Sequence, residues 1–357
     1  MDALFRELLL ISIGKCEEFS MEVSAKDLAF LYGEAKKQAM VGFLFAGIER
    51  TLVSTECDQE KKNMIFQWLA SCKSVERLNL IQRERLEELT SFFAKNSIRS
   101  TLLKGQGYAR FYPIPERRQC GDIDLWVDAN RDNVAKLCWN KWGIDHIDYK
   151  NMVLKSFPGA HVELHFIPSW FYNPFVDRKF RSWYRNFFEE QLRESLTNSI
   201  YTPTIDFDLV FCCIHIYKHI FDEGIGLRQL TDYYYILHHS SAEQRQQAYV
   251  ILRKFRMKKF VGAIMYVLKY FFEIDDSLLL CAVNERTGMK LLSDILCGGN
   301  FGHHNEKNKH GKENRIMRAI RNVRHNSDIL FDYPSEVLWS PLWKIWHWCW
   351  RKAKGYL

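Results

Sequence analysis

The sequence has 357 residues and is 47% hydrophobic and 26% charged, which argues against a disordered chain and suits about two domains of roughly 150 residues each. Its formal net charge of +7 suits an anionic substrate such as a nucleotide. The 50 basic residues are interleaved with 43 acidic ones, so no nucleic-acid partner is specifically indicated.

The cysteines and the N-terminus favour a protein of the cytoplasm. The ten cysteines include no CxxC pair, and we expect reduced thiols that serve as small hydrophobic side chains. The first residues, MDALFRELLLISIGKCEEF, lack the basic start and the cleavage site of a signal peptide. No apolar run reaches the ~20 residues that a membrane helix needs.

Residues 1–95 are predicted to form an N-terminal helical region. Leu4, Leu8 and Ile11 recur at helical spacing. A longer apolar stripe lies between Lys61 and Lys95, and it consists of Ile65, Trp68, Leu69, Val75, Leu78, Ile81, Leu86, Leu89 and Phe93. This stripe is interpreted as packing surface.

Residues 96–200 are predicted to form a mixed α and β core. The expected elements are a strand at 98–103, a glycine turn at 105–107 that opens a short helix, a strand at 123–127, a helix at 132–142, and a hairpin of 152–156 with 161–167. Pro113 and Pro115 end the short helix, and Pro158-Gly159 forms the turn of the hairpin.

Helical patterns return in residues 201–357, the predicted C-terminal helical domain. The expected helices are 206–221, 227–239, 242–255, 258–272 and 287–297, with basic helices toward the end of the chain. A loop at 298–314, rich in Gly, His, Asn and Lys, is a candidate lid over a substrate. The fold class is therefore α+β, with a small mixed sheet flanked by helices on both sides.

The segment 121–127, GDIDLWV, is the most informative part of the sequence. Because side chains alternate along a strand, Asp122 and Asp124 share one face while Ile123 and Leu125 point into the core. Two carboxylates about 4 Å apart repel by roughly 4 kcal/mol at an effective dielectric of about 20. The pair therefore predicts a bound cation, and oxygen ligands favour Mg²⁺.

A second strand, His161-Val162-Glu163-Leu164-His165, supplies a third acid. Glu163 shares one face of this strand with the two histidines. If the strand lies beside the Asp122 strand, Glu163 completes a cup of three carboxylates. Such a cup can hold divalent metals and orient an attacking hydroxyl for in-line phosphoryl transfer.

Upstream, a strand leads into the turn Lys104-Gly105-Gln106-Gly107, which opens a helix. Backbone N–H groups at such a turn form an anion site, and Lys104 adds positive charge. The glycine turn and the paired acids are each common when taken alone. Their order along the chain, with Glu163 last, is considerably more specific.

This ordered set resembles the DNA polymerase beta nucleotidyltransferase superfamily. More narrowly, the chain resembles a bacterial family of uncharacterised nucleotidyltransferases that is often met near polysaccharide-biosynthesis genes. The supporting motifs are Lys104-Gly105, Tyr112-Pro113, Arg118, Gly121-Asp122-Ile123-Asp124-Leu125, Glu163-Leu164-His165, the segment 224–230 with Asp232, and the segment 299–302. The resemblance covers most of the chain from about Leu102 to Trp343.

The resemblance implies a polymerase-beta-like core and transfer of a nucleotidyl group from an NTP, such as ATP, to an acceptor that the sequence does not identify. It implies Mg²⁺ or Mn²⁺ as cofactor, with Asp122, Asp124 and Glu163 as catalytic and metal-binding residues. The implied nucleotide-binding residues are Lys104, Gly105, Gln106, Gly107, Arg118, Arg228 and Asp232. Two features depart from the superfamily pattern: the turn is Gly-Gln-Gly, and the interval from Gly105 to Asp122 is long.

Two other functions fit parts of the pattern. A sugar transferase can use an Asp-x-Asp motif to hold a nucleotide sugar, although Lys104-Gly105 and Glu163 do not support this alternative. A nucleotide-sensing or scaffold protein could bind an NTP without turnover.

Several residues have a structural reading beside the functional one. His215 and His219 are one helical turn apart and are interpreted as structural histidines. Arg228 and Asp232 form either an intrahelical ion pair or a wall of the nucleotide site. The C-terminal tryptophans, with Lys344, Arg351, Lys352 and Lys354, are explained most simply by a helix docked on the core, with contact to a membrane surface as the alternative.

Overall fold

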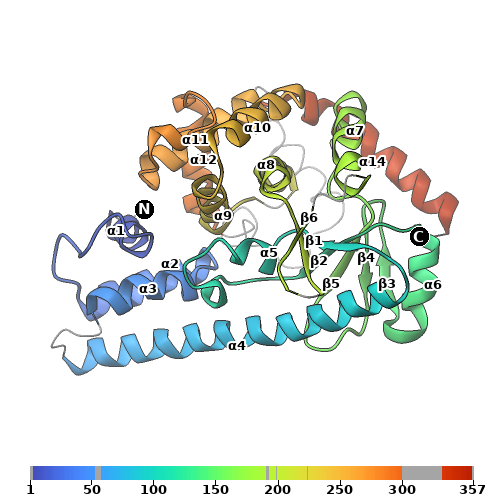
Figure 1. The fold of residues 1–357 in the computed structure, drawn as a ribbon. Coiled ribbons are helices and arrows are strands. Elements are labelled where there is room, and N and C mark those ends of the chain that lie inside the picture. Colours follow the sequence, from blue (N-terminus) through green and yellow to red (C-terminus); the bar gives the residue numbers. More distant parts are fainter. Residues whose placement is uncertain are drawn as a thin grey trace.

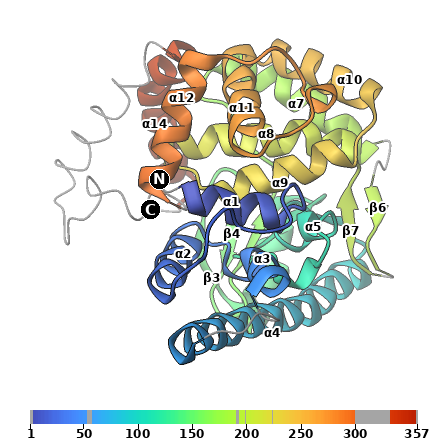
Figure 2. The same ribbon diagram turned by 90° about the vertical axis from the view of Figure 1, so that its left-hand side faces the viewer.

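A computed structural model describes residues 3–52, 58–189, 193–197, 199–222, 224–299 and 332–355. It has a mixed α and β fold in which helices outnumber strands, as expected (Figure 1). In Figure 2 the sheet lies between one long helix below it and a group of C-terminal helices above it.

In the described part of residues 3–95, four helices precede the sheet. They are α1 (Ala3–Ser12), α2 (Ala25–Lys37), α3 (Val41–Leu52) and α4 (Gln59–Lys95). Asp58 caps the start of α4, because its side chain accepts the N–H of Lys61. At 37 residues, α4 is about 55 Å long, and it runs beneath the rest of the molecule in Figure 1.

The main sheet has the strand order β1-β2-β5-β4-β3. Its strands are β1 (Ser100–Leu102), β2 (Ile123–Val127), β3 (Ile144–Ile147), β4 (Asn151–Leu154) and β5 (Val162–His165). The expected hairpin is confirmed, since β4 and β5 pair antiparallel. β2 and β5 pair parallel, and Asp124 stands opposite Glu163 in the register. This single parallel pair places the acids of both strands side by side.

The connecting elements differ in part from the prediction. They are α5 (Gln106–Ala109), the 3₁₀ turn η1 (Pro115–Arg117), α6 (Arg131–Trp142), α7 (Pro174–Glu189) and a second sheet of β6 (Arg193–Ser195) and β7 (Tyr201–Pro203). The sequence analysis predicted α6 but not β3, α7 or the second sheet. The helix after the glycine turn is only four residues long.

The expected C-terminal helices are confirmed with shifts of one or two residues at their ends. They are α8 (Ile205–Asp222), α9 (Leu227–His238), α10 (Ala242–Lys254), α11 (Lys258–Phe271), the 3₁₀ turn η2 (Asp276–Leu278) and α12 (Glu285–Gly298), followed by α14 (Pro334–Lys354). Most of the candidate lid at 298–314 lies outside the described residues, including Asn300-Phe301-Gly302.

Two hydrophobic cores hold the fold together, and α4 contributes to both. Trp68 and Cys72 pack into the larger core, which joins the N-terminal helices to α8–α12. Leu86, Leu89 and Phe93 pack into the smaller core under the sheet and α6. Because one continuous helix fills both cores, it fixes the sheet relative to the helical part.

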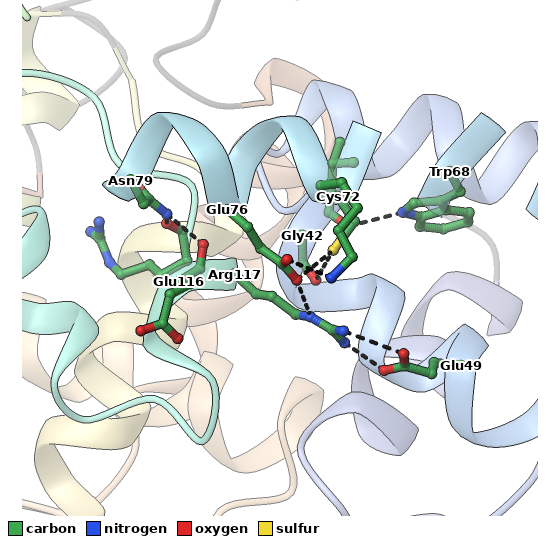
Figure 3. A network of polar contacts seen from close by, with 11 residues as sticks. Gly42, Glu49, Trp68, Cys72, Glu76, Asn79, Glu116 and Arg117 are labelled. Carbon is green, nitrogen blue, oxygen red and sulfur yellow. Dashed lines mark hydrogen bonds and ion pairs between the residues drawn. The ribbon is translucent and has the colours of Figure 1, made fainter. Parts of the chain in front are cut away.

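A polar network ties α4 to the segment that leads into β2 (Figure 3). Arg117 binds Glu49 of α3 at 2.6 Å and Glu76 of α4 at 2.9 Å. Asn79 donates from its amide to the carbonyls of Glu116 and Arg118, at 2.6 and 2.7 Å. A side chain at Gly42 would meet the Arg117 carbonyl at 2.5 Å, so α3 can approach η1 only with glycine there. The network fixes the chain just before the Asp-x-Asp strand.

Candidate active site

Three carboxylates meet where β2 and β5 run in parallel. Asp124 lies within β2 and is buried, whereas Asp122 precedes the strand and is half exposed. Glu163 of β5 is opposite Asp124 in the register and is partly buried. Asn151 of the neighbouring β4 donates to Glu163 at 2.6 Å and so fixes the orientation of its carboxylate.

Two histidines and a lysine contact these acids. The Nε2 atom of His165 lies 2.9 Å from Asp124 and 3.4 Å from Glu163. The Nδ1 atom of His161 lies 3.3 Å from Asp122. Lys104, at the end of the segment that follows β1, places its ammonium 3.0 Å from Asp124. The acids are thus held among cationic or proton-donating partners, which offset their mutual repulsion.

These contacts separate the pKa values of the three acids. Burial and the neighbouring Asp124 charge raise the pKa of Asp122. Burial also acts to raise the pKa of Asp124, but Lys104 and His165 outweigh it and hold that pKa below its usual range. Burial is likewise outweighed at Glu163, where the hydrogen bond from His165 lowers the pKa to about 2. Asp124 and Glu163 are therefore ionised at neutral pH.

The acids and histidines form two overlapping sets of potential metal ligands. One set is Asp122, His161 and Glu163, and the other is Asp124, Glu163 and His165; within each set the ligand atoms lie within 4.8 Å of one another. Glu163 belongs to both sets. This cluster of oxygen and nitrogen donors could hold a divalent metal ion.

The glycine turn contributes to the site through fewer residues than expected. Gly105 has φ +60° and ψ −116°, a conformation that favours glycine, and it lines the same cavity as the acids. The side chain of Gln106 instead donates to Asn79 of α4 at 3.1 Å. Gly107 is buried against Leu102. Because α5 is only four residues long, its N-terminus carries little of a helix dipole.

The opposite wall of the cavity comes from α8, α9 and the segment before β2. The guanidinium of Arg118 binds both oxygens of Asp232 at 2.7 Å, and Tyr112 donates to the same carboxylate. Asp232 thus pairs with Arg118 across the fold. Arg228 donates to the carbonyl of Gln119 at 2.7 Å and also lines the cavity.

The sequence analysis did not assign His165 or His215 to the site. His215 of α8 lines the cavity, 3.2 Å from His219. Burial and the nearby Lys104 charge lower its pKa well below the usual value, so its ring is neutral at pH 7. His165 shares a strand face with Glu163, so the alternation of side chains along this strand was the signal that could have identified it. Nothing in the sequence indicates that α8 packs over Lys104.

The cavity between these walls has a volume of about 80 Å³. Its lining combines the acids and Lys104 on the sheet side with Arg118, His215, Arg228 and Asp232 on the helical side. Its charged lining suits a metal ion and phosphate oxygens.

A family model described as uncharacterised nucleotidyltransferase matches residues 24–273, which is most of the chain. The chain belongs to this family. The match contains the glycine turn, the three acids, Arg118, Arg228 and Asp232.

Two further comparisons, with solved structures and with curated proteins, say less about the chain than the family model does. A solved structure, an antigenic nucleotidyltransferase-like protein from Paracoccidioides brasiliensis, is 13% identical with a TM-score of 0.36, and the alignment covers 59% of this chain and 95% of that one. None of the curated proteins compared with the chain matches it. Across the described part of the chain, no helix is both long and apolar enough to cross a membrane.

Proposed function

We propose that this chain transfers a nucleotidyl group from an NTP to the hydroxyl or phosphate of an acceptor, and that pyrophosphate is released. Asp122, Asp124 and Glu163 would hold a divalent cation, Mg²⁺ or Mn²⁺. The observation that carries the proposal is the position of Glu163, a possible ligand together with either aspartate. Membership of a nucleotidyltransferase family supports the same reaction.

In this reaction an acceptor oxygen attacks the α-phosphorus of the NTP. A new phosphorus–oxygen bond forms, the bond from the α-phosphorus to the oxygen that bridges to the β-phosphate breaks, and the electron pair leaves with pyrophosphate. A divalent cation held by these acids would neutralise charge on the phosphate oxygens. Glu163 faces the acceptor oxygen and accepts its proton. The Glu163 carboxylate is ionised at neutral pH and is therefore able to accept a proton.

Lys104 has two roles in the proposal. Without a cation, its ammonium balances the charge of Asp124 at 3.0 Å. Two positive charges on one carboxylate repel each other, so Lys104 turns toward the phosphates when Asp124 holds a cation. Arg228, on the opposite wall, contacts the same phosphates or the nucleoside. Arg118 supports this wall through its bidentate pair with Asp232.

A second candidate function is nucleotide binding without turnover, which the same acids and Lys104 would support. A sensing protein would bind Mg²⁺–NTP tightly and would release no pyrophosphate.

The proposal is tested by incubating the full chain with each NTP, Mg²⁺ or Mn²⁺, and a metabolite extract, followed by mass analysis. The expected result is an acceptor whose mass increases by one nucleotidyl group, together with pyrophosphate. Asp122→Asn and Asp124→Asn should abolish both while the circular dichroism spectrum stays unchanged. Tight NTP binding with neither product supports the sensing function instead.

A further inference from the structure

The C-terminal helix α14 docks on the sheet domain through one face. The ring of Trp343 stacks on Trp170, with centroids 5.4 Å apart. Tyr149 contacts Trp346 at 4.8 Å and Trp350 at 5.4 Å. At the start of the helix, buried Glu336 accepts backbone N–H groups from the segment before α7. The prediction that this helix docks on the core is therefore confirmed for one of its faces.

The other face of α14 exposes an apolar stripe. Leu338, Leu342 and Ile345 are 64, 56 and 62% exposed, and Trp348 is 54% exposed. Leu338, Leu342, Ile345 and Cys349 recur at the spacing of a single helical face. Single exposed apolar residues are common on proteins, but a continuous stripe along a helix marks an interaction surface.

Charge on α14 is almost entirely positive. Its one acidic residue, Glu336, is buried against the docked segment. Lys344 and Lys352 are exposed and flank the apolar stripe, and Lys354 is exposed at the C-terminal end. Tryptophan, leucine and isoleucine beside lysine on one helix face are typical of helices that lie in the interface of a bilayer.

The helix α7 continues this surface. Phe175, at its start, is 68% exposed, and its ring lies 6.0 Å from that of Trp339. Arg178 and Lys179 follow it and are exposed. A hollow of about 590 Å³ beside α7 is lined in part by Arg178, Arg181 and Arg185. In Figure 1, α7 and α14 lie next to each other at the edge of the molecule.

We propose that the exposed face of α14, together with the start of α7, binds the surface of an anionic lipid bilayer. The apolar stripe enters the headgroup boundary, and Lys344, Lys352 and Arg178 contact lipid phosphates. A second copy of the chain fits this surface less well. A symmetric dimer would bring the lysines beside the apolar stripe of one copy close to those of the other, and their positive charges would repel. No described helix is suited to span the membrane, so the contact is peripheral. This inference does not depend on the proposed reaction.

The test is co-sedimentation of the full chain with vesicles of phosphatidylcholine alone and of phosphatidylcholine with about one third phosphatidylglycerol. The wild type should partition onto the anionic vesicles at least tenfold more strongly, and added salt should weaken binding. Leu342→Glu/Ile345→Glu should reduce partitioning at least tenfold. Lys344→Gln/Lys352→Gln should remove most of the preference for anionic lipid.

The matched control is Phe66→Glu/Leu78→Glu. These residues are 64 and 58% exposed on α4, so the control adds the same charge at comparable exposure on another element. It should bind vesicles like the wild type. Circular dichroism and the melting temperature check that every variant is folded.

Two outcomes would overturn the proposal. The first is equal partitioning of the wild type and the α14 variant. The second is a wild type that stays in the supernatant with both vesicle types, above all if gel filtration shows a dimer that the α14 variant loses. That dimer would assign the apolar stripe to a contact between copies of the chain.

Discussion

At the residue scale, Asp124 is the most constrained group of the site. It is a buried carboxylate that is bound by Lys104 and His165 at once. Lys104→Ala removes the ammonium partner of Asp124 and should destabilise the metal-free protein by roughly 1–3 kcal/mol. Mn²⁺ should then raise the melting temperature of the variant more than that of the wild type, because the added cation replaces the lost charge.

The matched control for this prediction is Lys136→Ala, which removes an exposed lysine from α6. It should leave both the melting temperature and its response to Mn²⁺ unchanged. If Mn²⁺ raises the melting temperatures of Lys104→Ala and Lys136→Ala equally, the ion pair of Lys104 with Asp124 has no part in cation binding.

Glu163 gives a prediction about pH. Its pKa is lowered to about 2 from an unfolded value near 4.5, chiefly because the His165 hydrogen bond outweighs burial. A lowered pKa means that the ionised form stabilises the fold above pH 4.5, and that this stability is lost as pH falls from 4.5 toward 2. As the pH falls through this range, the unfolding free energy of the metal-free wild type should decrease relative to that of Glu163→Gln. Urea unfolding at several pH values measures it, and a difference independent of pH would contradict the assignment.

The acids could be predicted from the sequence, but the contacts of the glycine turn could not. Alternation along two strands was enough to group Asp122, Asp124 and Glu163. The contact of Lys104 with Asp124, and the turning of Gln106 toward Asn79, depend on how α4 and β2 pack against the turn. Such distant packing leaves no periodic signal in the chain.

At the element scale, α4 positions the segment that leads into the Asp-x-Asp strand. Asn79 is buried and satisfies the carbonyls of Glu116 and Arg118. Asn79→Leu has a similar size but leaves these acceptors without a donor, which should cost roughly 1–3 kcal/mol of stability. Thermal or urea unfolding measures the loss. Asn63→Leu, on an exposed position of the same helix, is the control and should cost much less.

The pair of Arg118 and Asp232 links the same segment to α9. Both side chains are about 95% buried. Asp232→Asn leaves the guanidinium in the interior without its counter-charge, and this should cost about 3–5 kcal/mol. A loss below about 1 kcal/mol in urea unfolding would show that Arg118 finds another partner or reaches solvent.

Most helices with a long periodic pattern were predicted well, whereas α7 and the short strand β3 were not. The helices from α8 to α12 were placed correctly because each buries an apolar face. The four-residue strand β3 has an edge position and no buried residue, so its sequence carries no strong pattern. The missed α7 buries Val176, Phe180, Tyr184 and Phe188 at four-residue spacing. The sequence therefore does carry a periodic signal for this helix.

At the scale of the whole molecule, the candidate site lies where the two parts of the fold meet. The sheet provides the acids, and α8 and α9 provide the opposite wall. The α+β class and the helical flanks followed from the order of patterns along the chain. The closure of α8 and α9 over the acids did not, because it depends on the core that α4 shares with both parts.

The central claim is that the three acids direct attack at the α-phosphorus of an NTP. The most direct measurement uses NTP labelled at the α-phosphate in one reaction and at the γ-phosphate in a parallel one, with Mg²⁺ or Mn²⁺ and a metabolite extract. The account predicts that the acceptor gains the α label alone and that the γ label leaves in pyrophosphate. It also predicts that Glu163→Gln slows transfer at least ~10²-fold while NTP still binds. Transfer of the γ label, or α-label transfer at the wild-type rate in both Asp124→Asn and Glu163→Gln, would contradict it.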